Sequence, residues 1–150
     1  MSSTRTLIAD PSPATRTWLR TALPGRSSEI VEVAAGWEIL WHLAEEEVDL
    51  VITTARLGDA EGHQVLAMAR TAGVQVPFVL VSPVPRSLLR KAVKRAGNAG
   101  LVESWPDAAA LRSEVNRLTR PTPVARRPGR PARLLESARA LALRSLALPG

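Results

Sequence analysis

The chain has 150 residues, 45% of them hydrophobic, which suits one folded domain with a short appendage. It contains no cysteine, and this excludes disulfides, thiolate catalysis and cysteine-ligated zinc. The net charge of +6 resides in residues 120–150, because residues 1–119 carry 13 basic and 13 acidic side chains.

Short apolar segments alternate with segments of helical periodicity along residues 1–119. Near the start of the chain, Ser12 can cap a helix that has Pro13 at its first position. The expected strands are 6–9, 30–33, 50–53, 78–81 and 100–103, and the expected helices are 13–23, 36–47, 62–72, 85–96 and 107–118.

This alternation defines the fold class. Five strand–helix units in a row imply an α/β fold, with a parallel sheet and helices on both of its faces. The run at 50–53 is apolar and β-branched throughout, as expected for a strand covered on both faces. We predict a flavodoxin-like (βα)5 three-layer sandwich with a five-stranded parallel sheet, in which the first two strands hold the middle.

The character of the sequence changes after residue 119. Residues 120–131 contain four prolines and several arginines, and we expect them to form a basic linker that is not helical. Residues 132–150 consist mainly of leucine, alanine and arginine, which favour a C-terminal amphipathic helix. Its apolar stripe contains Leu134, Ala138 and Leu141.

The chain carries no targeting or membrane signal that we can identify. No run approaches the roughly 20 apolar residues of a membrane helix. The first ten residues also lack the apolar stretch of a signal peptide. We therefore expect a cytoplasmic protein that does not contact a membrane.

Several segments between residues 5 and 118 resemble the CheY-like receiver domains of bacterial response regulators. They follow the order of that family without large gaps. The matching segments are 7–13, 35–40, 48–62, 76–82 and 96–111. The resemblance implies a receiver fold and a role in two-component, or phosphorelay, signal transduction.

The resemblance also implies a phosphorylation pocket made of an acidic pair, an acceptor aspartate, a Ser or Thr, and a Lys. In such a pocket the acids hold Mg²⁺, and metal and Lys neutralise the phosphoryl charge. Carried over position by position, Asp10 keeps the first acidic place and Ser82 keeps the hydroxyl place. Pro11, Thr54 and Ser104 replace the second acid, the acceptor aspartate and the lysine.

These replacements predict a degenerate receiver, or pseudo-receiver. Thr54 is a poor nucleophile without an adjacent base, and a single carboxylate binds Mg²⁺ weakly. We therefore expect a protein that is not an enzyme and that uses no cofactor or metal. Asp10 can equally cap the turn after the first strand, and Asp59 lies in a loop and is not taken as an acceptor. A working phosphoacceptor with unusual residues is a further alternative.

Two surfaces are candidates for protein partners. Trp37 and Trp41 lie one helical turn apart, away from the face that Ile39, Leu40 and Leu43 mark as buried. They form either a partly exposed pair that meets a partner or two rings lying flat on neighbouring side chains. The fourth helix is either a basic partner face or an ordinary solvated one. Its basic residues are Arg86, Arg90, Lys91, Lys94 and Arg95.

The tail offers candidate nucleic-acid contacts. Residues 127–131 resemble an AT-hook, whose arginines lie in the DNA minor groove, although Pro128 stands where an arginine usually precedes the glycine. The alternative is a plain linker. The candidate contacts are Arg126, Arg127, Arg130 and Arg133.

Two hypotheses about function follow. The first is a non-catalytic signalling regulator, in which a phosphorylation-independent receiver domain acts through protein–protein interaction. The alternative is a DNA-binding regulator that uses the basic tail, with the receiver fold as a dimerisation module.

Overall fold

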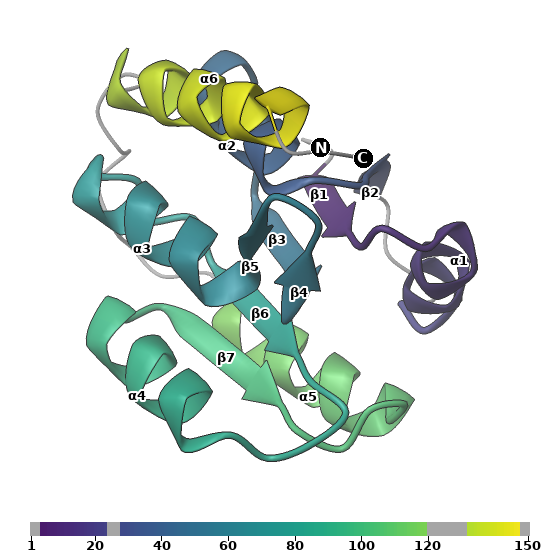
Figure 1. The fold of residues 1–150 in the computed structure, drawn as a ribbon. Coiled ribbons are helices and arrows are strands. Elements are labelled where there is room, and N and C mark those ends of the chain that lie inside the picture. Colours follow the sequence, from purple (N-terminus) through teal and green to yellow (C-terminus); the bar gives the residue numbers. More distant parts are fainter. Residues whose placement is uncertain (1–3, 24–27, 120–131, 148–150) are drawn as a thin grey trace.

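The computed structural model describes residues 4–23, 28–119 and 132–147, which form a five-stranded parallel sheet flanked by helices (Figure 1). The strand order is β2-β1-β3-β6-β7. The strands are β1 (Thr4–Ala9), β2 (Ser28–Val33), β3 (Leu50–Thr54), β6 (Phe78–Val81) and β7 (Ala99–Val102). The helices are α1 (Pro13–Thr21), α2 (Gly36–Glu45), α3 (Gly62–Thr71), α4 (Ser87–Ala96), α5 (Ala108–Leu118) and α6 (Ala132–Ala147).

The order confirms the flavodoxin-like class but corrects the place of β2. We expected the first two strands in the middle of the sheet, whereas β2 forms an edge and β1 pairs with both β2 and β3. The sequence explains the difference, because β2 carries the exposed acids Glu29 and Glu32. By contrast, β3 is buried along nearly its whole length, as a central strand must be.

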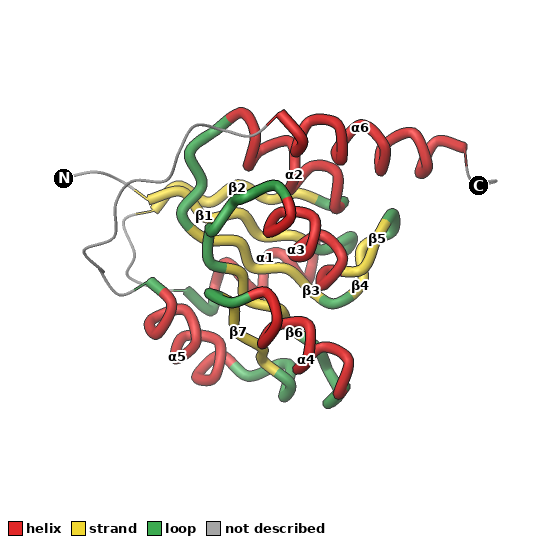
Figure 2. Tube along the Cα trace, turned by 90° about the vertical axis from the view of Figure 1, so that its left-hand side faces the viewer, coloured by secondary structure: helices red, strands yellow, loops and turns green. Residues whose placement is uncertain are grey.

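Side chains that alternate along the strands build a core on each face of the sheet. Leu7 and Val51 enter the core shared with α2, α3 and α4. Ile8 and Ile52 enter the core shared with α1 and α5. Figure 2 shows the two helical layers with the sheet between them. The three-layer arrangement therefore follows directly from the period of two along each strand.

The first helix begins as the sequence predicts. Ser12 has extended backbone, and its hydroxyl accepts a hydrogen bond from the Thr15 N–H at 3.4 Å. Pro13 is the first helical residue, where its missing N–H costs nothing. This cap fixes the turn that joins the end of β1 to α1.

The loop after β3 contains an element that we did not predict. Strands β4 (Arg56–Leu57) and β5 (Ala60–Glu61) form a short antiparallel hairpin around the pair Gly58-Asp59. Glycine followed by aspartate is a two-residue hairpin signal, but strands of two residues are too short for a periodicity argument. The hairpin leads directly into α3.

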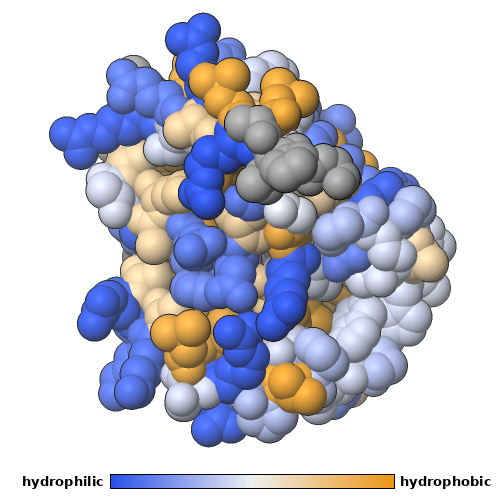
Figure 3. Space-filling model, in the orientation of Figure 1, coloured by the Kyte–Doolittle hydropathy of each residue, from blue (hydrophilic) through white to orange (hydrophobic). Residues whose placement is uncertain are grey.

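The C-terminal helix packs on the domain. Its predicted stripe is confirmed, since Leu134, Ala138 and Leu141 are buried in the same core cluster as α2 and α3. Figure 1 shows α6 lying across α2. A second set of leucines on α6 remains exposed, and Figure 3 shows apolar side chains gathered over this helix. None of the helices in the described residues is long and apolar enough to cross a membrane.

Candidate functional site

The carboxyl ends of β1, β3 and β6 meet at an open pocket of about 480 Å³. In open α/β sheets, ligands bind at this edge, where the strand order reverses direction. Here the reversal lies between β1 and β3, whose ends supply Asp10 and Thr54 to the pocket. Ser82, directly after β6, lies in the same lining. The structure therefore brings together three of the five pocket residues taken from the sequence.

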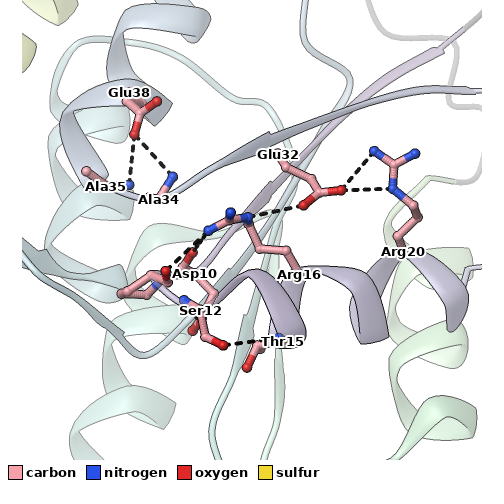
Figure 4. Close-up of polar contacts among 10 residues, drawn as sticks. Asp10, Ser12, Thr15, Arg16, Arg20, Glu32, Ala34, Ala35 and Glu38 are labelled. Carbon is pink, nitrogen blue, oxygen red and sulfur yellow. Dashed lines mark hydrogen bonds and ion pairs between the residues drawn. The ribbon is translucent and has the colours of Figure 1, made fainter.

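The Asp10 carboxylate is engaged on both of its oxygens. One oxygen accepts a hydrogen bond from the Thr54 hydroxyl, and the other accepts from the Ser12 N–H at 2.7 Å. Arg16 donates to the Asp10 carbonyl oxygen at 2.6 Å and also pairs with Glu32 (Figure 4). Asp10 is 9% exposed. This arrangement supports the role of Asp10 as the cap of the turn after β1.

The two serines are likewise hydrogen-bonded within the chain. The Ser82 hydroxyl donates to the Val84 carbonyl oxygen at 2.7 Å. The Ser104 hydroxyl donates to the Asp107 carboxylate at 2.8 Å, and Asp107 caps α5 by accepting from the Ala110 N–H at 3.0 Å. The Ala110 bond and the Ser104 bond lower the pKa of Asp107. Ser104 thus belongs to a helix cap.

Pro11 and Ser104 do not line the pocket. Both are exposed. The places that the resemblance assigns to the second acid and the lysine therefore contribute no charged group to the site.

The lining of the pocket contains two arginines that the sequence analysis did not place there. Arg56, on β4, and Arg86, which precedes α4, both line it. Arg86 lies 3.8 Å from Glu61, while Arg56 has no ion pair in the part of the chain that the structure describes. The signal for Arg56 was its position two residues after Thr54, at the ligand-binding edge of the sheet. The lining thus holds two guanidinium groups against one carboxylate.

Trp105 forms an aromatic wall of the pocket. Its ring packs edge-on against Trp18 of α1, with the ring centroids 4.4 Å apart and an interplanar angle of 66°. Both rings are partly buried and pack against the core shared by α1 and α5, which restricts the movement of Trp105. Sequence reasoning treated residues 105–107 only as part of the family resemblance.

The residues present do not fit Mg²⁺. The ion requires several oxygen ligands in near-octahedral geometry, usually with more than one carboxylate. Asp10 is the only carboxylate in the lining, and both of its oxygens already accept hydrogen bonds. Within residues 4–23, 28–119 and 132–147 no group of three His, Asp or Glu side chains could hold a metal ion.

Asp59 proves to be a structural residue that sequence reasoning missed. It is 8% exposed and reaches from the hairpin to the start of α2. Its two carboxylate oxygens accept from the Gly36 N–H at 2.8 Å and from the Trp37 N–H at 2.9 Å. Asp59 caps α2 from 22 residues away, so the sequence near the start of α2 does not indicate this cap. Only the three-dimensional structure reveals it.

The sequence left open whether Trp37 and Trp41 are partly exposed or lie on neighbouring side chains, and the structure shows that the two rings differ. Trp41 is 42% exposed, with its ring edge-on to His42. Trp37 is partly buried and packs against the core. Only Trp41 therefore offers a largely free aromatic surface on α2.

The basic surface around α4 is partly neutralised. The helix begins at Ser87, so that Arg86 lies at its cap position. Arg90 pairs with Glu103 at 2.9 Å, and this carboxylate raises the pKa of Arg90. Lys91 and Lys94 are exposed. Of the tail arginines, Arg133 is exposed on α6, and Arg126, Arg127 and Arg130 lie outside the described residues.

Comparison with known proteins shows similarity of fold. No family model and no curated protein matches the chain. Among solved structures, a CheY-like response regulator receiver domain from Methanospirillum hungatei has a TM-score of 0.68 at 20% identity, over 77% of this chain and 93% of its own. The receiver domain of a Pseudomonas aeruginosa sensor histidine kinase, solved with magnesium in its active-site cleft, has a TM-score of 0.65 at 17% identity, over 79% and 98%.

A third neighbour matches a longer part of the chain. The signal receiver domain of a protein described as a LuxO repressor, from Vibrio parahaemolyticus, has a TM-score of 0.70 at 15% identity. It covers 95% of this chain and 97% of its own, so the match extends past residue 131 into α6. The chain thus has the fold of response-regulator receiver domains.

Proposed function

We propose that this protein is a pseudo-receiver: a non-catalytic regulator of a two-component pathway that works in the cytoplasm through protein contacts, without phosphorylation. The observation that carries the proposal is Thr54. It stands at the end of β3, where the resemblance places the acceptor aspartate, and its hydroxyl donates to Asp10. The lack of an acceptor carboxylate and the poor fit to Mg²⁺ support a signalling role that does not depend on phosphoryl transfer.

The first prediction concerns this chemistry. Treatment with acetyl phosphate and Mg²⁺ should give no acyl-phosphate, because the pocket holds neither an acceptor carboxylate nor a metal-binding acid pair. Intact-mass spectrometry measures the outcome, with a receiver that has all the family residues as the positive control. An adduct mapped to Asp10, Asp59 or any other carboxylate of residues 1–118 would contradict the proposal.

The second prediction concerns the partner surface. Trp41→Ala should destabilise the fold less than Trp37→Ala, because the Trp41 ring is 42% exposed, yet it should reduce the capture of a partner. Trp37→Ala should destabilise the fold, since this ring packs on the core. Capture from the native cell by the full chain is compared for Trp41→Ala and Lys91→Ala. If only Lys91→Ala reduces the capture of the partner, the partner binds at α4 instead of at Trp41.

A DNA-binding regulator is the alternative, and the observation that favours it is the concentration of the whole net charge of +6 in residues 120–150. If four tail arginines contact phosphates, log K for duplex DNA should fall with log salt with a slope of roughly −3 to −4. Anisotropy titrations compare the full chain with a variant in which Arg126, Arg127, Arg130 and Arg133 are glutamine. Equal binding by both chains, or none at low salt, would remove this alternative.

A further inference from the structure

The pocket at the carboxyl ends of the strands is large enough for a small molecule. Its volume of about 480 Å³ lies within the range of roughly 300–1,000 Å³ that is typical of small-molecule sites. Its polar groups Asp10, Thr54 and Ser82 are hydrogen-bonded within the chain. The charged groups that remain available for a ligand are therefore the two arginines, and beside them lie Thr15 and the apolar wall.

The charge at the rim favours an anion. Arg56 has no ion pair among the residues that the structure describes, and Arg86 has a single, long one to Glu61 at 3.8 Å. Guanidinium groups bind carboxylates through two parallel hydrogen bonds, a geometry that a spherical ion cannot exploit. Two arginines in the lining of one open pocket thus offer guanidinium donors to a carboxylate.

The apolar wall of the pocket favours a ligand that has a flat, apolar body. The pocket is lined by the apolar residues Val81, Pro83, Val84 and Trp105, and Val84 is 53% exposed. Trp105 packs against Trp18, and this contact restricts the orientation of its ring before a ligand binds. Apolar walls with a few placed polar groups are the general pattern of small-molecule sites.

We propose that this pocket binds an aromatic monocarboxylate, with the carboxylate on Arg56 and Arg86 and the ring against Trp105. In a receiver that is not phosphorylated, binding of this ligand would be the regulatory signal. This inference therefore rests on the proposed phosphorylation-independent function. The two proposals fail separately, since the acyl-phosphate test makes no use of the organic ligand and the binding test is made on untreated protein.

Calorimetric titration of the full chain with three probes tests the proposal. The probes are 1-naphthoate, its neutral analogue 1-naphthalenemethanol, and inorganic phosphate. Because a hydrogen bond to a charged group contributes substantially to binding, naphthoate should bind about tenfold more tightly than the alcohol. Phosphate, which lacks the apolar body, should bind more weakly than naphthoate. Equal affinity for naphthoate and either of the other probes overturns the proposal.

Arginine variants and the NMR signals of the tryptophan side chains show where naphthoate binds. Arg56→Gln and Arg86→Gln should each weaken naphthoate binding about tenfold, and Arg95→Gln, on the same basic face, should leave it unchanged. In a ¹⁵N-labelled chain, naphthoate should shift the indole N–H signal of Trp105, assigned with Trp105→Phe, and leave that of Trp41 in place. Equal losses in all three arginine variants, or an unshifted Trp105 signal, would show that the ligand binds elsewhere and overturn the assignment.

Discussion

Replacing Leu134 and Leu141 together by alanine is expected to lower the free energy of unfolding by about 4–10 kcal/mol, since each buried Leu→Ala change costs about 2–5 kcal/mol. Both side chains are almost completely inaccessible to solvent and lie in the core beneath α6. They are two helical turns apart, so their effects should be nearly additive. A loss of this size approaches the whole stability of a typical domain, which is about 5–15 kcal/mol.

Urea denaturation of the full chain measures this effect. The matched control is Leu146→Ala, the same change in the same helix at a side chain that is 83% exposed. The control should shift the free energy of unfolding by less than about 0.5 kcal/mol. If the double variant unfolds at the same urea concentration as the control, α6 does not pack on α2 in solution.

The second large effect is expected at Asp59. Asp59→Ala should cost about 2–4 kcal/mol, because it leaves the buried N–H groups of Gly36 and Trp37 without their acceptor. Asp59→Asn retains one carbonyl oxygen and should lose roughly half as much. The comparison is again made by denaturation in urea.

The control for Asp59 is Glu45→Ala, which removes an exposed carboxylate from the other end of the same helix. It should change stability by less than about 0.5 kcal/mol. A similar loss in Glu45→Ala and Asp59→Ala would mean that general charge effects, and not the cap, account for the role of Asp59.

The fold could be predicted from the sequence where the signal is local or periodic. The continuous apolar run of β3, the Ser12 cap and the stripe of α6 each depend on residues close together in the chain, and all three are confirmed. The predicted position of β2 was wrong, because the order of the strands depends on how exposed each strand is. The acids Glu29 and Glu32 on β2 already indicated an edge.

The site was harder to predict than the fold. Asp10, Thr54 and Ser82 could be placed through the resemblance, since each lies at the carboxyl end of a strand. The cap from Asp59 to α2 could not, because it joins residues more than 20 positions apart. The two arginines of the pocket also come from separate elements, Arg56 from β4 and Arg86 from the cap position of α4. Residues brought together by tertiary structure alone leave no spacing that a sequence pattern can detect.

The contact between Trp18 and Trp105 gives the molecule a built-in optical marker. Two indoles with ring centroids 4.4 Å apart and planes inclined by 66° couple their electronic transitions and produce an exciton couplet in circular dichroism. The chain contains no tyrosine and one phenylalanine, so the other aromatic absorption comes mainly from Trp37 and Trp41, and Trp18→Phe identifies the part of the spectrum that belongs to the pair. The couplet depends on the mutual orientation of α1 and the segment after β7, and its sign and amplitude therefore report the geometry of the pocket wall without any label.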